Sequence, residues 1–125
     1  MNRSEVTYHR DIFIPTNVTV PARTVKVEYS GHALAESAAD RYGSVPRVTH
    51  VNLAHPAVQI IEVTLDAQTR ALAKVLVRIP SSANVLDDIV LVLRPARGAW
   101  LAVTTWLNRR DDKHRTLDRS KYGTR

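Results

Sequence analysis

Cysteine is absent from the 125-residue sequence. Its absence excludes disulfide bonds, thiolate nucleophiles and sulfur-ligated zinc, so side-chain packing alone must stabilise the fold. The sequence also contains no apolar stretch as long as a membrane-spanning helix, and the N-terminal MNRSEVTYHRD lacks the apolar core of a signal peptide. We therefore expect a cytoplasmic protein.

The motifs of several enzyme classes are missing as well. There is no glycine-rich phosphate loop, no GxSxG nucleophile motif and no HExxH zinc motif. Carboxylates occur side by side at Asp87–Asp88 and Asp111–Asp112, but consecutive side chains usually point apart, so we interpret them as solvated. We therefore expect no metal and no other cofactor.

Strand-like sequences dominate the second half of the chain. Runs rich in β-branched residues occur at 58–65 (VQIIEVTL), 71–79 (ALAKVLVRI), 88–95 (DIVLVLRP) and 99–108 (AWLAVTTWLN). The short connections between them are typical of hairpins. These four runs predict an antiparallel meander.

The segment SGHALAESAADRYG, residues 30–43, has the one convincing helical pattern in the sequence. Ser30 can cap its N-terminus and Gly43 can end it. One helix face is apolar at intervals of four residues: Leu34, Ala38 and Tyr42. Upstream, the extended pieces IFIP, VTVP and TVKVEY are interrupted by prolines, which is typical of edge strands or loops.

Together these elements predict an α+β fold. One main helix would pack on a curved antiparallel sheet of about four strands, with short N-terminal edge strands. With 44% hydrophobic and 24% charged residues, the chain has the composition of a single folded domain. We divide it into an extended N-terminal segment (1–29), a core (30–108) and a basic C-terminal tail (109–125).

Positive charge is concentrated in that tail. The whole chain has a formal net charge of +6 and a pI of about 10.2. From Arg109 onward there are seven basic and three acidic residues, so seven minus three leaves four of the six net charges there. The tail therefore predicts contact with phosphate or with an acidic partner, and the alternative is a solvated, partly frayed terminus.

Alternation along the predicted strands gathers cations and an aromatic residue. Lys74 and Arg78 share one face of their strand, and Arg94 ends the next strand. The last strand groups further side chains by the same alternation: Thr104, Trp106 and Asn108. Because bases stack on aromatic rings and phosphates pair with Arg or Lys, this face suits single-stranded RNA. The alternative is a solvated face on which nearby acids neutralise the cations.

Trp100 belongs to the same alternation as Trp106. A tryptophan in a small domain commonly fills the core, because its ring buries a large apolar area. We expect that structural role for Trp100, beneath the predicted helix.

Histidine is the candidate acid or base, and the sequence contains five. His32 falls in the first turn of the predicted helix, where the positive end of the helix dipole favours the neutral ring. A neutral imidazole can act as a general base near pH 7. The alternative is a local hydrogen bond at the helix start.

Several of these motifs resemble a known superfamily. A helix opening with GHA, followed by strands carrying KVLVR, DIVLVLRP and AVTTWLN, resembles the small nuclease-toxin superfamily that includes barnase, EndoU, colicin and RelE-type ribonucleases. In more detail, YSGHALAESAADRYGSV and TTWLNRRDDKHRTLDRSKY look like a group of small proteins encoded by tailed bacteriophages. The resemblance covers roughly residues 27–122 and implies a phage protein that acts in the cytoplasm of a host bacterium.

The resemblance implies a metal-independent endoribonuclease. In such enzymes a base deprotonates the 2′-hydroxyl, which attacks phosphorus, while cations stabilise the phosphoryl oxygens. His32 would be the base or acid, Arg78 would bind the phosphate, and Thr104 or its neighbour Thr105 would supply the hydroxyl of the last strand. The substrate contacts would come from the same surface and the start of the tail: Lys74, Arg94, Trp106, Asn108, Arg109 and Arg110.

A second acid/base partner for His32 is not evident in the sequence. Glu36 lies within the predicted helix, and the sequence does not determine which way Glu62 faces. Three hypotheses therefore stay open. The first is a metal-independent ribonuclease or toxin that acts on RNA, the second a noncatalytic phage protein that binds an acidic host protein, and the third a minor virion component.

Overall fold

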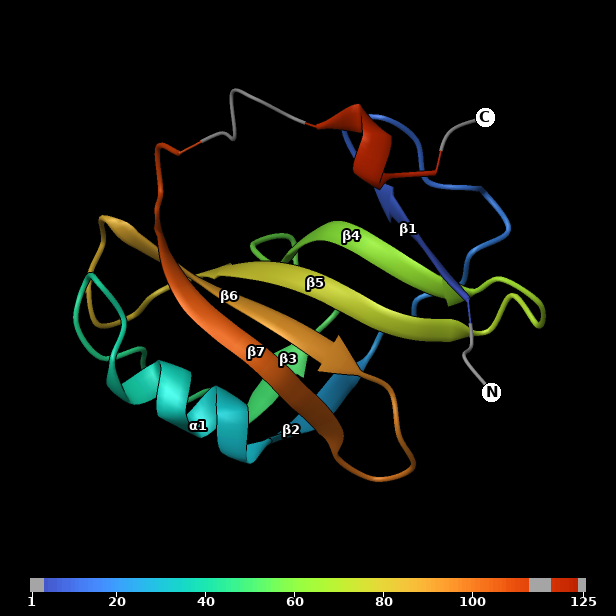
Figure 1. The fold of residues 1–125 in the computed structure, drawn as a ribbon. Helices are drawn as coiled ribbons and strands as arrows, with labels where there is room; N and C mark the ends of the chain where they lie inside the picture. Colours follow the sequence, from blue (N-terminus) through green and yellow to red (C-terminus); the bar gives the residue numbers. More distant parts are fainter. Residues whose placement is uncertain (1–3, 113–117, 124–125) are drawn as a thin grey trace.

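The structure is a computed structural model that describes residues 4–112 and 118–123, so parts of the predicted tail, 113–117 and 124–125, lie outside the described residues. The helix α1 (Gly31–Ala38) and the 3₁₀ helix η1 (Arg119–Lys121) accompany seven strands (Figure 1). The strands are β1 (Glu5–His9), β2 (Thr24–Tyr29), β3 (His50–Asn52), β4 (Gln59–Asp66), β5 (Leu72–Pro80), β6 (Asp87–Arg94) and β7 (Trp100–Arg109). Neither helix in the described ranges has the length and apolar character needed to cross a membrane.

All seven strands belong to one mixed sheet. Their order is β1-β4-β5-β6-β7-β2-β3. β4, β5, β6 and β7 form the antiparallel meander that their sequences predict. β2 pairs in parallel with the start of β7, with Val27 opposite Trp100, and β3 pairs antiparallel with β2. The sheet is therefore antiparallel except at the junction of β7 and β2.

The predicted α+β fold with about four strands is wrong. Of the residues that the structure describes, 44% are in strands and only 10% are helical, which makes this part of the chain mostly β. TVKVEY forms β2, which lies inside the sheet between β7 and β3 and is not an edge strand. β1 adds another strand beside β4. These pairings join distant parts of the chain, and local sequence patterns carry little information about such partners.

Of the two alternatives predicted for the N-terminal IFIP and VTVP pieces, edge strand or loop, the structure has a loop. Their side chains pack against the buried cluster of Tyr8, Val63 and Leu65. The apolar pattern in this region therefore reflects a covering loop over one end of the core. The loop residues that pack there are Phe13, Ile14, Val18 and Val20.

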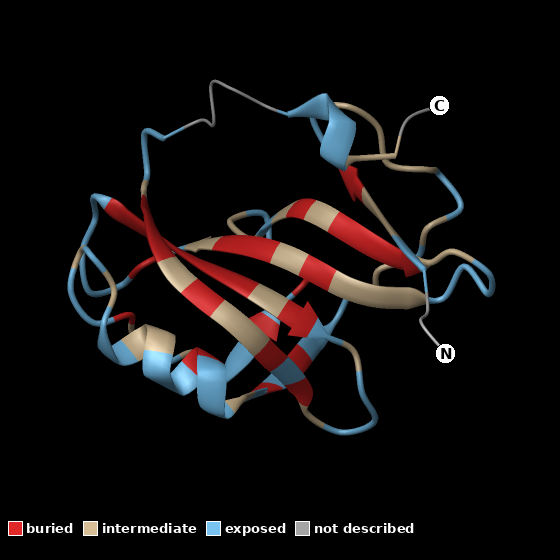
Figure 2. Cartoon of the chain, viewed as in Figure 1, coloured by how far each residue is buried: buried red, intermediate tan, exposed pale blue. Residues whose placement is uncertain are grey.

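The two faces of the sheet differ in burial. Figure 2 shows buried and less buried positions alternating along β5 and β7, as expected for strands. One face carries the fully buried Val77 and Leu91 and packs against the main hydrophobic cluster. Trp100, with 2% of its surface exposed, belongs to this cluster, which confirms its predicted core role. β2 and β3 lie behind β6 and β7 in Figure 1 and add their valines to the same cluster.

The helix α1 begins as predicted but uses a different face. The Ser30 hydroxyl caps it by accepting a hydrogen bond from the Ala33 N–H at 3.1 Å. Leu34 (40% exposed) and Ala38 do not lie in the core, whereas Tyr42, in the turn after the helix, packs against the main hydrophobic cluster. The carboxylates of Glu36 and Asp40 instead accept hydrogen bonds from the backbone of β7, from the N–H groups of Thr105 (3.2 Å) and Leu107 (3.3 Å).

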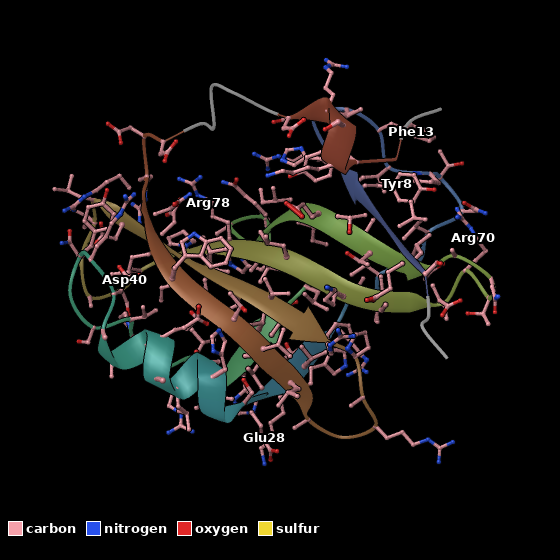
Figure 3. The ribbon with its side chains drawn as sticks, in the orientation of Figure 1. Tyr8, Phe13, Glu28, Asp40, Arg70 and Arg78 are labelled. Carbon is pink, nitrogen blue, oxygen red and sulfur yellow. The ribbon has the colours of Figure 1, made fainter. Side chains whose placement is uncertain are left out.

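These two carboxylates cap the free edge of β7 beyond its pairing with β2. An exposed strand edge presents unpaired N–H groups that invite pairing with other chains. Glu36 and Asp40 satisfy two of these donors with side chains from α1 and from the turn that follows it. The position of Asp40 beside β7 can be followed in Figure 3.

Replacing Asp40 with alanine is expected to lower the free energy of unfolding by about 1–3 kcal/mol, because the N–H groups of Leu107 and Tyr42 both lose their acceptor. Urea denaturation of the purified variant measures this loss. Asp40→Asn is the matched control, since its amide oxygen can still accept one of the two bonds. Equal losses in both variants would show that charge, and not hydrogen bonding, explains the effect.

Candidate functional site

The sheet face opposite the core, called the open face here, carries the polar side chains of interest. Cross-strand register defines it, because residues directly opposite each other point to the same side. His9 of β1 lies opposite Glu62 of β4, and Glu62 lies opposite Leu76 of β5. Further across, Arg78 lies opposite Val90, and Val90 lies opposite Trp106 of β7. The open face therefore extends across five strands.

A cavity of about 210 Å³ lies on the open face, between the sheet and the segment that follows β7. We call it the site cavity. Its floor comes from five strands and its cover from residues 118–122. The lining residues are His9, Ile61, Glu62, Leu76, Arg78, Val90, Trp106, Asp118, Lys121 and Tyr122.

His9 is almost completely buried, with 3% of its surface exposed. Its Nδ1 accepts a hydrogen bond from the Asp11 N–H at 3.0 Å. An accepting Nδ1 carries no proton, so the proton of the neutral ring lies on Nε2. Among the residues that the structure describes, no acceptor lies within hydrogen-bond distance of Nε2. His9 thus presents an N–H donor at a cavity wall.

Glu62 lies beside His9 and is held by a tyrosine from the other end of the chain. The Tyr122 hydroxyl donates a hydrogen bond to Glu62 Oε2 at 3.1 Å, and the Tyr122 ring meets the His9 ring edge-on with centroids 5.1 Å apart. Burial, followed by the negative charge of Glu62, raises the pKa of Tyr122 to about 12. Tyr122 therefore stays protonated at neutral pH and remains a donor to Glu62.

Arg78, predicted as a catalytic phosphate ligand, is engaged within the protein. Its Nε donates to Asp88 Oδ2 at 2.7 Å, and both side chains are more than nine-tenths buried. Its terminal nitrogens donate to three backbone carbonyls, those of Arg109, Arg110 and Asp112. A guanidinium with these four contacts has little capacity left for phosphate, and we interpret Arg78 as a structural residue that fixes the chain where it leaves β7 (Figure 3).

The predicted residues of β7 lie on the open face. Thr104 lies opposite Val92, and the partly exposed Trp106 lies opposite Val90 and lines the site cavity. Asn108 is buried opposite Asp88. Thr105 points the other way, and its hydroxyl donates to the Val90 carbonyl at 2.9 Å. Of the two threonines considered for the hydroxyl, Thr104 is therefore the one on this face.

Trp100 and Trp106 lie on different faces although six positions separate them in one strand. Alternation alone predicts the same face for both. The consecutive β6 residues Val92 and Leu93 pair with Thr104 and Ala102, so Val103 is an extra residue in β7, a β-bulge between Trp100 and Trp106. A bulge of this kind changes which side chains point to a given face.

The other predicted substrate contacts are cations with acidic neighbours. Lys74 and Arg94 both approach Glu5, at 4.0 and 3.9 Å. Arg109 pairs with Asp87 at 2.8 Å, and Arg110 pairs with Asp88 at 3.0 Å. The first two arginines of the tail thus fold back onto β6, and the acids of the chain neutralise much of the positive charge on this surface.

His32 lies outside the site cavity. Its side chain is 71% exposed on α1, with Nε2 3.4 Å from Glu36 Oε2. Since Glu36 bonds the free edge of β7, His32 lies beyond that edge, whereas Arg78 is on β5, two strands further in. The structure therefore groups Arg78 with His9 and Glu62, not with His32.

Sequence reasoning missed His9, Glu62, Lys121 and Tyr122 as site residues. Glu62 had a usable signal, because it is the one charged residue in the strand-like run VQIIEVTL. His9 had none, since its strand was not predicted and its partner lies far away in the sequence. Within the described residues there is no cluster of three or more His, Asp or Glu side chains arranged to hold a metal ion.

Comparison with known proteins adds no further assignment. No protein-family model, no curated protein and no solved structure matches this chain. The function must therefore follow from the chemistry of the site residues themselves.

Proposed function

We propose that this protein binds single-stranded RNA on the open face and cleaves it by attack of the 2′-hydroxyl, with Glu62 as the general base. The observation that carries the proposal is the direct cross-strand pairing of His9 and Glu62 in the wall of a cavity. An acceptor and a donor side by side are what proton transfer at a phosphodiester needs. The resemblance to nuclease toxins agrees with this choice of substrate.

The shape of the site supports an unpaired base. The partly exposed Trp106 lines the cavity with the apolar side chains of Leu76 and Val90. A base removed from its stack can lie against an indole, and this contact is worth about 1–3 kcal/mol per base. A second, polar hollow of about 520 Å³ adjoins the site cavity and shares His9, Ile61 and Arg78 with it. The neighbouring nucleotide has space there, so His9 would lie close to the phosphate between the two nucleotides.

The proposed reaction assigns one step to each residue of the pair. Glu62 accepts the proton of the 2′-hydroxyl, and the 2′-oxygen forms a bond to phosphorus. The bond from phosphorus to the 5′-oxygen breaks, and that oxygen takes a proton from water. The hydroxide left behind takes the proton from Glu62, which restores the carboxylate. The Nε2–H of His9 donates to a non-bridging phosphoryl oxygen as its charge grows. The products are a 2′,3′-cyclic phosphate and a free 5′-hydroxyl.

Incubation of the purified protein with a labelled single-stranded RNA pool in EDTA tests this proposal. We expect fragments that end in 2′,3′-cyclic phosphate. The same sequences made as DNA are the matched control, because they lack the 2′-hydroxyl and should remain uncut. RNA that is bound but intact would contradict the reaction and favour a binding protein, whereas RNA that is neither bound nor cut would favour an acidic protein as the partner.

A further inference from the structure

The segment Asp118–Gly123, called the C-terminal segment here, covers part of the open face. It supplies Asp118, Lys121 and Tyr122 to the lining of the site cavity. We infer that this segment is a substrate-binding part of the site, in which Lys121 contacts a phosphate of the bound strand and Gly123 permits docking. The inference rests on the proposed RNA-directed function and adds residues that hold the substrate.

The C-terminal segment docks on β1 and β4 through a few specific contacts. The Gly123 N–H donates to the Thr7 carbonyl of β1 at 2.8 Å. One residue earlier, Tyr122 bonds Glu62 through its hydroxyl and contacts His9 through its ring. Both residues of the proposed His9–Glu62 pair therefore contact this segment. Figure 1 shows η1 beside β1, above the β4 and β5 strands.

Docking requires glycine at position 123. A Cβ atom there would lie 2.5 Å from Tyr8 Cε1, closer than real Cβ atoms come to another heavy atom, and a tight 3.0 Å from Val6 Cγ1. The Tyr8 ring cannot easily move away, because Phe13 packs edge-on against it and Arg70 donates to its hydroxyl at 3.3 Å (Figure 3). Any side chain at position 123 must therefore displace the segment or the buried Tyr8.

Lys121 differs from the other cations on the open face. Arg78, Arg94 and Arg110 each have a carboxylate within 4 Å. Lys121 is exposed, and no ion pair within 4 Å is found for it among the described residues. The nearby Asp118 carboxylate already accepts hydrogen bonds from the backbone and hydroxyl of Ser120. A phosphate at the cavity would therefore meet the ammonium of Lys121 without first breaking an ion pair.

Two variants and one control test the role of the C-terminal segment. Gly123→Ala should undock the segment, and Lys121→Gln should remove the phosphate contact from a docked segment. Gly31→Ala is the matched control, because nothing lies within 4 Å of a Cβ atom at Gly31. Hydrogen exchange of the amide at position 123, measured by NMR, reports docking independently of RNA. Fluorescence anisotropy with a 2′-O-methyl oligonucleotide, which lacks a reactive 2′-hydroxyl, reports affinity.

We expect faster exchange at position 123 and about tenfold weaker binding in Gly123→Ala, and no change in Gly31→Ala. Lys121→Gln should keep slow exchange, and the slope of log affinity against log salt concentration should become shallower by about 0.7, the value for one phosphate contact to a single strand. Lys121→Arg should restore the slope. This rescue and the salt slope separate a phosphate contact from a merely structural role.

The possible outcomes separate the inference from the proposed function. The inference would be overturned if Gly123→Ala undocks the segment without changing the affinity, or if Lys121→Gln leaves the salt slope unchanged. RNA cleavage by the parent protein would still support the proposed function in either case. If both variants bind the oligonucleotide more weakly than the parent protein, but the parent does not cleave RNA, the inference would be supported and the proposed reaction overturned. A parent protein with no affinity for the oligonucleotide would overturn both.

Discussion

Replacement of Arg78 by alanine is expected to lower the free energy of unfolding by about 3–5 kcal/mol, the typical cost of leaving one partner of a buried ion pair alone. Asp88 would keep a carboxylate that is 6% exposed, and among the described residues its remaining ion-pair partner would be the partly exposed Arg110. Three backbone carbonyls at the end of β7 would also lose their donor. Urea denaturation followed by tryptophan fluorescence measures the change.

Arg94→Ala provides the matched control for this measurement. Arg94 is a cation on the same face, but it is 46% exposed and only 3.9 Å from Glu5, so its loss should cost about 0–1 kcal/mol. If Arg78→Ala lowered the free energy of unfolding no more than Arg94→Ala does, the Asp88 carboxylate would have to be solvated. Arg78 would then again be available as a phosphate ligand.

Glu62→Gln is expected to slow RNA cleavage by about 10²–10⁴-fold, the usual contribution of a general base. The amide cannot accept the proton of the 2′-hydroxyl. It has nearly the same size, and its oxygen can still accept the hydrogen bond from Tyr122, so the fold and the RNA affinity should change little. Single-turnover cleavage at saturating protein separates this loss of rate from any loss of binding.

Glu28→Gln is the control for charge in general, because Glu28 is an exposed carboxylate on β2, away from the site cavity (Figure 3). It should cleave RNA at the parental rate. An unchanged rate in Glu62→Gln would remove Glu62 as the base. The next candidate for the base would then be His32, which lies beyond the edge of β7 with its Nε2 3.4 Å from Glu36 Oε2.

The sequence-based prediction was most successful where local chemistry decides the structure. The four runs of β-branched residues became β4 to β7 because their side chains alternate between a buried and a less buried face. Ser30 caps α1 as expected, since a cap depends on residues only a few positions away. The same period of two explains why Lys74 and Arg78 share a face.

The sequence-based prediction failed where residues that are distant in the sequence determine the local structure. Leu34 suggested an apolar helix face, yet Glu36 of α1 and Asp40 of the turn that follows it bond to β7, because the free edge of that strand offers unpaired donors. Such donors exist only once the sheet has formed. Similarly, the cationic character of Arg78 suggested a phosphate ligand, but the approach of Asp88 and of three carbonyls turned it into a structural residue.

The sequence by itself determined the four strands of the meander, the absence of disulfide bonds and a sheet face bearing Arg78 and Trp106, because composition and two-residue periodicity act locally. Only the tertiary structure decided that His9 lies opposite Glu62 and that Tyr122 contacts both residues. Pairing between strands that are distant in the sequence brings together residues from both ends of the chain. The burial of side chains from these distant segments selects the pairings. The candidate site consists mainly of such pairings.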